Sequence, residues 1–365
     1  MTRLLLAGGG HAHIEVLRRF AAQRLTAVDV VVASPHRGLL YSGMVPGVIA
    51  GAYAKRAATI DVAALARAAG ASFVEHALVA VDAEQRRASL ADGSSLAYDL
   101  LSLDIGGITA MPPVADGVIA VPVRPFTGLL EAWTRMRETA ARGGLTTIAI
   151  VGGGAAAIEI AFAMKASLRA ASIAIVTDRS DVATAHSPRV RRRLERLLAA
   201  RGIGIVRGRA VTAITADGVT LADGTTVPAQ WTVVATGAAP TPWLRASGLA
   251  CDPDGFVATD ACLQSTSHPG VFAVGDCATQ TNSPRPHAGV YAVRAGPPLA
   301  DNLRRALAGR APASYRPQRK ALALISAGPD YAVLSRPPWS AEGRWVWRWK
   351  DRIDRKFVAR YRTPA

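Results

Sequence analysis

Cysteine is scarce in this chain of 365 residues, which has only Cys251, Cys262 and Cys277. Three scattered cysteines cannot form a disulfide framework, and no CxxC pair or other spacing typical of metal ligands occurs. We therefore expect no metal site and a reducing, cytoplasmic setting. No Cys-x4-Cys pair is present either, which excludes a relay in which two thiols form and break a disulfide during catalysis.

Long apolar runs are also missing. Residues 145–164 come closest, but they contain three glycines and Glu159, and a buried strand followed by a helix explains them better than a membrane span. The chain leads from Met1 directly into a strand pattern, so we expect no signal peptide. Because half of the residues are hydrophobic, the sequence predicts a folded globular protein of about two domains.

Acidic side chains are few: 27 Asp and Glu stand against 43 Lys and Arg, which gives a formal charge of +16. This charge favours anionic partners such as nucleic acids, acidic lipids or cofactor phosphates. Much of it is arginine on expected helical surfaces, as over residues 188–201, where an apolar stripe predicts an amphipathic helix. We expect no nucleic-acid binding, because no helix-turn-helix, RNP or zinc-finger pattern occurs.

Two glycine clusters are present in similar surroundings. Gly8 and Gly10 follow an apolar run near the start of the chain, and Gly152 and Gly154 follow another midway. Each pattern predicts a buried strand, a tight turn and a helix whose N-terminal amides can bind the pyrophosphate of a dinucleotide. Neither motif is complete, because a histidine replaces the third glycine in the first cluster and an alanine replaces it in the second.

A second pair of matching segments follows the glycine clusters. One Ala-Asp-Gly turn precedes a strand that ends near Gly106, and another precedes a strand that ends near Gly237. The same order of parts, at nearly the same offset, indicates two duplicated α/β units. We predict an α/β fold with two Rossmann-like dinucleotide-binding domains.

After the second unit, the sequence HPGVFAVGDCA predicts a further strand over residues 271–274, followed by Gly275 and Asp276. With the glycine clusters, this motif resembles the FAD/NAD(P)-linked pyridine nucleotide-disulphide oxidoreductase family. The chain is most similar to its type II NADH dehydrogenase and sulfide:quinone oxidoreductase branch. GGGHAH at residues 8–13, YSGMVPG at 41–47 and W-x-W-x-K-D-x-I-D at 347–354 resemble a subgroup found alone or fused in front of selenophosphate synthetase.

The resemblance implies an FAD-binding domain built from residues 1–110 and 260–310. Residues 125–259 would form an inserted NAD(P)H-binding domain, and residues 311–365 a C-terminal extension of a β-hairpin and a helix. The implied activity is hydride transfer from NAD(P)H to FAD and electron transfer from FAD to a quinone or another small acceptor. The nicotinamide nucleotide and this acceptor are the expected partners, and the oligomeric state is left open.

The same resemblance implies two sets of cofactor-binding residues. In the FAD site, Asp276 would bind the ribityl chain and Pro46 would lie at the ring, while a serine stands where an acidic residue normally binds the adenosine ribose. The FAD set comprises Gly8, Gly10, His11, Ala12, Ser34, Pro46, Gly106, Gly275, Asp276, Gly289 and Val290. The NAD(P)H set comprises Gly152, Gly154, Asp178 and Gly237. Asp178 could bind the ribose diol of NADH, whereas the adjacent Arg179 could pair with the extra phosphate of NADPH.

Glu159 is the candidate catalytic residue. In related dehydrogenases the matching glutamate lies beside the nicotinamide and the flavin, which implies a role in positioning or in proton handling. A carboxylate in the first turns of a helix also suits the helix dipole, so a structural role is the alternative. His11 and His13 lie in the first glycine loop, where they could contact FAD phosphates or act as structural hydrogen-bonding groups.

The electron acceptor is left open by the sequence. The helix that presents two glutamines to the quinone in type II NADH dehydrogenases has Val290 and Arg294 here. Its N-terminus, at residues 288–290, would still stabilise negative charge on reduced flavin. Sulfide oxidation is an alternative activity, although it needs paired cysteines and Cys277 has no evident partner. A low-turnover flavin-binding partner protein linked to selenium metabolism is the other alternative.

Aromatic and basic residues crowd the C-terminal extension. Trp345, Trp347 and Trp349 alternate with the spacing of a strand, and a helical pattern rich in arginine begins at Ile353. Such segments suit a membrane surface, which would place the protein peripherally on the inner face of the membrane. An ordinary hairpin and helix packed across the two domains is the alternative.

Overall fold

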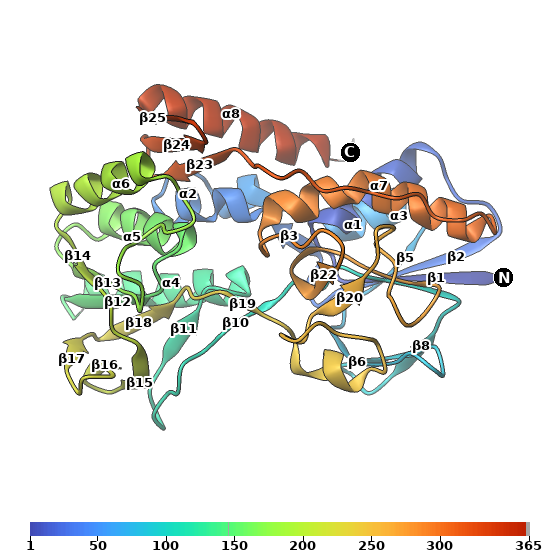
Figure 1. Ribbon diagram of the computed structural model, residues 1–365, viewed down its shortest axis with the longest axis horizontal. Helices are drawn as coiled ribbons and strands as arrows, with labels where there is room; N and C mark the ends of the chain where they lie inside the picture. The colour runs from blue at the N-terminus through green and yellow to red at the C-terminus, as the bar shows by residue number, and fades with distance from the viewer. Residues whose placement is uncertain (145, 363–365) are drawn as a thin grey trace.

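The computed structural model describes residues 1–144 and 146–362, which form two α/β units and a C-terminal layer (Figure 1). The first unit contains a five-stranded parallel sheet in the order β21-β9-β1-β2-β5. Its strands are β1 (Thr2–Ala7), β2 (Val28–Ala33), β5 (Ser72–Val74), β9 (Leu100–Leu103) and β21 (Val271–Ala273). One face carries helices α1 (His11–Ala22), α3 (Val62–Ala68) and α7 (Gly289–Leu307). The other face carries an antiparallel sheet of β6 (Leu78–Asp82), β7 (Arg87–Leu90) and β8 (Ser95–Ala97).

The second unit repeats this plan. Its parallel sheet has the order β11-β18-β12-β13-β14. These strands are β11 (Ala120–Pro122), β12 (Thr147–Val151), β13 (Ser172–Val176), β14 (Ile203–Val206) and β18 (Trp231–Val234). The helices are α4 (Phe126–Ala141), α5 (Ala155–Ser167) and α6 (Pro188–Ala200), and the antiparallel sheet is β15 (Val211–Thr215), β16 (Gly218–Leu221) and β17 (Thr226–Pro228). The predicted α/β class with two Rossmann-like units is therefore confirmed.

Both faces of the central strands are buried, which explains their unbroken apolar sequences. In β1, Leu4 and Leu6 pack with the helices, whereas Leu5 and Ala7 pack with the antiparallel sheet. None of the four is exposed to solvent. A strand that is covered on both faces needs apolar residues at consecutive positions, so its sequence does not alternate between apolar and polar residues.

Short elements complete and join the two units. Strands β10 (Ile108–Thr109) and β19 (Ala238–Ala239) pair between them, and α2 (Val45–Ile49) of the first unit packs on α5 of the second. The first unit also contains the pairs β3 (Gly38–Leu40) with β4 (Thr59–Asp61) and β20 (Val257–Thr259) with β22 (Ala278–Gln280). The β10–β19 pair and the packing of α2 on α5 join the two units.

The C-terminal layer is a three-stranded antiparallel sheet followed by a long helix. It consists of β23 (Ala323–Ser326), β24 (Ala332–Arg336), β25 (Trp339–Gly343) and α8 (Arg344–Arg360). The predicted hairpin and helix are present, but the prediction of a strand through Trp345, Trp347 and Trp349 is wrong, because all three lie on α8. The buried positions of α8 have helical spacing, yet two of them are Lys350 and Asp354, so a search for apolar periodicity misses the stripe.

Helix α8 and its sheet contact both units, as the packing alternative requires. The Lys350 ammonium donates to the Gly43 carbonyl at 2.5 Å, and the Tyr361 hydroxyl donates to Glu15 at 3.1 Å in the first unit. In the second unit, His186 bonds to Ser335 of β24 at 2.8 Å. No helix in the described part of the chain combines the length and apolar character needed to cross a bilayer.

Gly8→Ala should destabilise the fold by more than backbone strain alone. Gly8 has a φ of +92°, and a Cβ there would lie 2.3 Å from the carbonyl oxygen of Asp104. Gly93→Ala is the matched control, because Gly93 has a φ of +85° with nothing within 4 Å of the added carbon. We expect Gly93→Ala to lower the free energy of unfolding by about 1 kcal/mol, and Gly8→Ala by about 3 kcal/mol or more. Equal losses in urea unfolding would show that the turn tolerates a side chain.

Candidate functional site

A cleft of about 490 Å³ lies at the carboxyl ends of β1, β9 and β21, where open parallel sheets of this kind bind ligands. Its size is in the range typical of cofactor sites. Seven of the predicted FAD residues line it, namely Gly8, Gly10, His11, Ser34, Gly106, Asp276 and Gly289. The other four, Ala12, Pro46, Gly275 and Val290, do not line the cleft, and Ala12 and Pro46 are buried beside it.

The N-terminus of α1 is capped by a carboxylate that follows β9, the strand next to β1 in the sheet. Asp104, at the end of β9, is buried and accepts hydrogen bonds from the backbone amides of Ala12 at 2.7 Å and His13 at 2.9 Å. A Cβ at Gly10 would collide with this carboxyl group. In a typical glycine motif the first amides of the helix are free to bind phosphate. Here two of them already bind the carboxylate of Asp104. Asp104 also lines the cleft, and sequence reasoning missed it because the motif does not include it.

His13 serves as a structural hydrogen-bonding group. Its Nδ1 lies 2.6 Å from the Gly8 carbonyl oxygen and its Nε2 lies 2.8 Å from the Ser102 hydroxyl. Burial lowers the pKa of His13, so the neutral ring is favoured. The side chain fills the space that a third glycine would leave and ties the loop to β9.

His11 lines the cleft, and its pKa is also lowered by burial, although Asp104 and Asp276 oppose this shift. Its ring lies next to Tyr41 and Phe357, with centroid separations of 5.8 and 6.4 Å. His11 therefore lies between the cleft and Phe357 of helix α8.

Arg124 supplies positive charge to the cleft. Its guanidinium Nη2 lies 3.2 Å from the carboxylate of Asp276, and both side chains line the cleft and are largely buried. Arg124 comes from the segment that joins the two units, and no sequence motif marked it. Ser34 lies at the end of β2, where its hydroxyl donates to the His36 carbonyl at 3.2 Å.

The second glycine loop has an open helix N-terminus. A Cβ at Gly154 would meet nothing within 4 Å, and the residue that matches Asp104 is Ala235, which carries no charge. Asp178 and Arg179 follow β13 and form a loose ion pair of 3.8 Å, with side chains 65% and 71% exposed. The loop thus presents backbone amides and both candidate ribose-recognition groups to solvent, while Gly237 follows β18.

Glu159 lies where α5 meets the C-terminal sheet, and it does not line the cleft. Its Oε1 accepts a hydrogen bond from the Ser326 backbone amide at 2.8 Å. Burial raises the pKa of Glu159, and this effect outweighs the opposing influence of the Lys350 ammonium and the Ser326 amide. The carboxyl group is therefore suited to hold a proton.

Lys350 belongs to a buried polar cluster between α8 and the segment 41–47, which includes the start of α2. Its Nζ lies 2.5 Å from Asp354, and the carboxylate of Asp354 acts electrostatically on the Tyr41 hydroxyl, whose pKa is raised chiefly by burial. Phe357 stacks on the Tyr41 ring with a centroid separation of 4.4 Å. The sequence motifs YSGMVPG and W-x-W-x-K-D-x-I-D thus contact each other directly.

Cys277 is a buried thiol that hydrogen-bonds to the Val274 carbonyl at 3.2 Å. Burial raises its pKa to about 12, so the thiolate needed for sulfur chemistry is strongly disfavoured. The pKa values of Cys251 and Cys262 are also raised by burial. None of the three thiols is poised for nucleophilic attack.

A family model for pyridine nucleotide-disulphide oxidoreductases matches residues 2–296. The chain belongs to this family. Ferroptosis suppressor protein 1 of Xenopus tropicalis is 23% identical over 279 residues, which cover 72% of this chain and 71% of that protein. Demethylphylloquinone reductase NdbB of Synechocystis is 28% identical over 283 residues, which cover 73% of this chain and 69% of that protein.

The solved structure of the sulfide:quinone oxidoreductase of Aquifex aeolicus has the same fold as this chain. The two structures match with a TM-score of 0.82 over 99% of this chain and 92% of that one, at 17% sequence identity. Other solved structures with this fold include oxidases bound to NADH and to NADPH. The comparisons confirm the predicted family, the class of oxidoreductase enzyme, and FAD with a nicotinamide dinucleotide as its cofactors.

Glu159→Gln should stabilise the protein, increasingly so as the pH rises. The folded state raises the pKa of Glu159, so between the unfolded and folded pKa values the native protein holds a proton that the unfolded chain releases. The free energy of unfolding therefore falls with pH across this window and stays lower above it. Glu159→Gln should remove this loss of stability at high pH, because glutamine does not ionise. Glu131→Gln, on the surface of α4, is the control and should leave the pH dependence of stability unchanged.

Urea unfolding of the wild type and both variants from about pH 4 to 9 measures this effect. The wild type and Glu159→Gln should converge at the acid end. A Glu159→Gln variant that is less stable at the alkaline end would show that the ionised carboxylate, through Lys350, contributes favourably to the fold.

Proposed function

We propose that this protein takes a hydride from NAD(P)H through FAD and passes electrons to a quinone or another small acceptor. The observation that carries the proposal is the cleft at the carboxyl ends of the first sheet, where the first glycine loop meets Asp276 from far along the chain. The second glycine loop, with its open helix N-terminus, supports an exchangeable nucleotide site. When bound, FAD supplies the hydride and electron chemistry, and the protein supplies binding and orientation.

The residues of the cleft suit FAD, with one departure from the usual arrangement. Gly8 and Gly10 would let the backbone approach the pyrophosphate closely. Gly106 and Gly289 also line the cleft. Because Asp104 occupies two amides of α1, we propose that Arg124 supplies most of the positive charge for the pyrophosphate. Asp276 would then exchange its bond with Arg124 for the ribityl hydroxyls.

The nucleotide donor binds at the second loop in this proposal. The open amides at the start of α5 would take its pyrophosphate. Asp178 follows β13, the position from which an acidic residue recognises the ribose of NADH, and we propose NADH as the preferred donor. Arg179 offers NADPH a competing contact with its extra phosphate.

Glu159 is the residue that we propose for proton handling. Its raised pKa allows the protonated form to persist, and only one of its carboxylate oxygens is bound to the Ser326 amide. The other oxygen is available to hold a proton or to orient the nicotinamide. Placement on α5, the helix that begins at the second glycine loop, supports this role.

A quinone is the acceptor that we propose first, because the name of one relative specifies reduction of demethylphylloquinone. Gly289, the first residue of α7, lines the cleft together with Asp276, so the N-terminus of this helix lies where it would stabilise anionic reduced flavin. Sulfide oxidation is disfavoured because the Cys277 thiol is buried and has a raised pKa. The contact between the segment 41–47 and α8 supports the proposed placement in the subgroup that shares both motifs.

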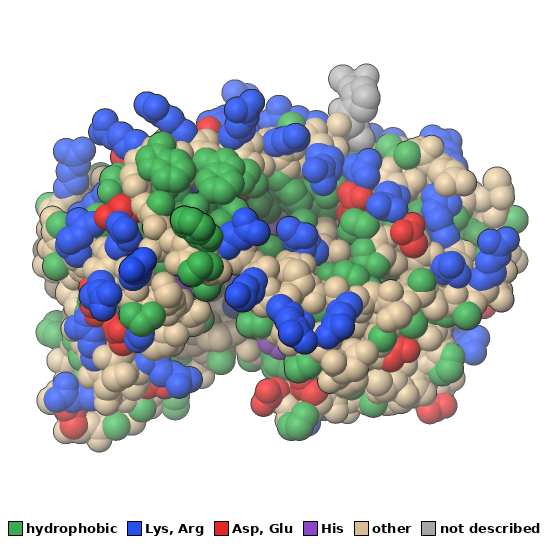
Figure 2. Space-filling model, turned by 45° about the horizontal axis from the view of Figure 1, so that its top comes forward, with side chains coloured by type: hydrophobic (Ala, Val, Ile, Leu, Met, Phe, Trp, Pro, Cys, Tyr) green, Lys and Arg blue, Asp and Glu red, His purple; other side chains and the backbone are tan. Residues whose placement is uncertain are grey.

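The outer surface of the C-terminal layer supports peripheral membrane contact. Trp345, Trp349 and Ile353 follow one another at helical spacing on α8 and are 55%, 40% and 40% exposed, and Trp339 on β25 is 74% exposed. Figure 2 shows hydrophobic side chains gathered at this end of the molecule among many lysine and arginine side chains. Exposed tryptophan beside basic residues suits the interface of an anionic bilayer.

Anaerobic reduction of the flavin tests the proposed function. Purified protein should bind FAD, and NADH should bleach the oxidised flavin absorbance. Asp178→Ala should reduce the advantage of NADH over NADPH, whereas the surface control Asp116→Ala should not. Protein that binds FAD but is reduced by neither nucleotide would contradict the proposal. A screen of quinones and ferredoxin-type proteins as acceptors then defines the second half-reaction.

Arg124→Gln and Asp104→Asn should change FAD affinity in opposite directions. Loss of the Arg124 charge should weaken FAD binding by about tenfold, and loss of the Asp104 charge should tighten it by up to about tenfold. Arg37→Gln is the matched control, because Arg37 is 59% exposed and does not line the cleft. Quenching of flavin fluorescence measures each affinity, and weaker binding by Asp104→Asn would refute the opposed roles.

Trp345→Ser combined with Trp349→Ser should reduce binding to vesicles that contain anionic lipid by about fivefold or more. Ile119→Ser is the control, because Ile119 is 60% exposed in the second unit. Co-sedimentation at physiological salt measures the bound fraction. Wild-type protein that stays in the supernatant at all lipid concentrations would remove the membrane contact from the proposal.

A further inference from the structure

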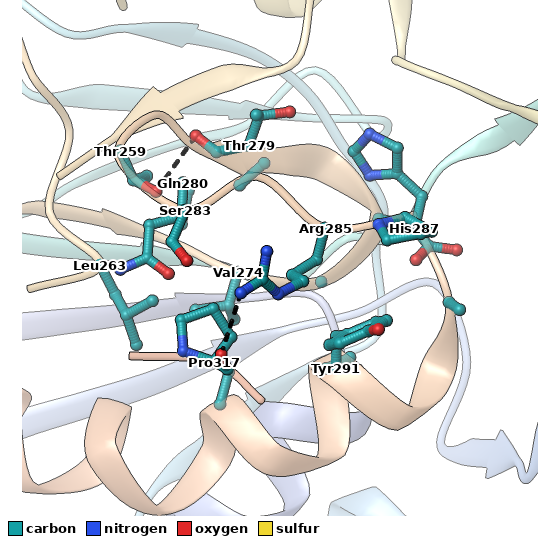
Figure 3. A pocket seen from close by; sticks show the side chains of 18 of the residues that line it. Thr259, Leu263, Val274, Thr279, Gln280, Ser283, Arg285, His287, Tyr291 and Pro317 are labelled. Atoms are coloured by element: carbon teal, nitrogen blue, oxygen red, sulfur yellow. Dashed lines mark hydrogen bonds between the residues drawn. The ribbon is translucent and has the colours of Figure 1, made fainter. Parts of the chain in front are cut away.

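A second, smaller cavity lies beside the cofactor cleft, near the N-terminus of α7. It measures about 60 Å³, and it shares Asp276 and Ala292 with the cleft as common walls. A cavity needs roughly 10–15 Å³ of such space to hold one water molecule, so this cavity can admit a group of a few heavy atoms. Figure 3 shows polar side chains arranged around it, including Ser283 and Tyr291.

Arg285 extends into this cavity (Figure 3). Its Nε, Nη1 and Nη2 donate to backbone carbonyls of residues 318, 284 and 317, at 3.0, 2.7 and 3.2 Å. A guanidinium has five N–H donors, so these three bonds leave two. Carbonyl groups hold the side chain in place but carry no net charge, and no ion pair within the described residues includes Arg285.

The surroundings of Arg285 favour an anion. Asp276 is the one acidic residue that lines the cavity, and its carboxylate is already paired with Arg124. The hydroxyl of Tyr315, another lining residue, is buried and has no hydrogen-bond partner among the described residues. Arg294 lies close enough to Tyr315 to act on it electrostatically, as Arg285 does. The guanidinium of Arg285 and the unbonded hydroxyl of Tyr315 therefore belong to side chains that line the same small cavity.

We propose that this cavity binds a small oxyanion, with Arg285 as the anchoring cation and the hydroxyls of Ser283 and Tyr315 as further donors. A planar guanidinium fork matches the paired oxygens of a carboxylate or a phosphate. Two sources share this chemistry: a free inorganic oxyanion, and the acid group of a small organic molecule whose remaining atoms extend out of the cavity.

Bound anion would add negative charge on the far side of Asp276 from the cofactor cleft. Since Asp276 and Ala292 belong to both walls, the negative charge of such an anion would repel the phosphates of FAD and would lower the affinity of the cleft for FAD. This consequence rests on the proposed function, whereas the binding of the oxyanion does not.

Calorimetric titration of the protein with sodium phosphate and with sodium benzoate, at constant ionic strength, tests the site. Phosphate binding alone indicates an inorganic ligand, and tighter binding of benzoate indicates an organic acid. Arg285→Gln should weaken binding at least about tenfold, because it removes a charged hydrogen-bonding partner. Arg319→Gln is the matched control, because Arg319 is exposed on the neighbouring segment and does not line the cavity.

Ser283→Leu provides an independent check, since it should fill the cavity without removing Arg285 and should also abolish binding. This variant keeps the test decisive if circular dichroism shows that Arg285→Gln does not fold. Absence of binding by both anions, or an equal loss in Arg285→Gln and Arg319→Gln, would overturn the proposal. Titrations without FAD separate this result from any failure of the flavin chemistry.

Discussion

The close crossing of each glycine turn over the neighbouring strand is the constraint on which both units depend. Gly8 passes so near the end of β9, and Gly152 so near the end of β18, that a Cβ at either position would lie within 2.4 Å of a backbone carbonyl oxygen. Only this closeness lets the helix begin directly above the carboxyl ends of the strands. The helix N-terminus, the cleft and the strand-end glycines therefore occupy one edge of each sheet.

The two units keep this backbone plan but differ in what surrounds the turn. In the first, His13, Ser102 and Asp104 form a buried polar lining, whereas the matching positions of the second are occupied by alanine and valine. A polar lining fixes the loop through hydrogen bonds, while the apolar lining leaves the amides of α5 accessible. The two units thus differ in their electrostatic environment at the same place in the fold.

The sequence was sufficient for the parts of the fold that follow local rules. Consecutive apolar residues bounded by glycine predicted β1 and β12, and the repeat of two motifs predicted the two units. It was insufficient where charged groups are buried. Lys350 and Asp354 neutralise each other inside the helix interface, so α8 has no continuous apolar stripe and its tryptophans suggested a strand. Asp104 and Arg124 escaped notice because their roles arise from contacts with residues distant in the sequence.

The carboxylate of Asp104 also bears on how the protein matures. A helix N-terminus that awaits a phosphate group has unsatisfied amides until the ligand arrives, and a buried end of this kind opposes folding. Here the chain satisfies two of these amides itself, through a residue translated some 90 positions later. The first glycine loop and the start of α1 can therefore reach their native arrangement once β9 and Asp104 have been made, without waiting for the flavin. The formation of this loop is in this way independent of the supply of the cofactor.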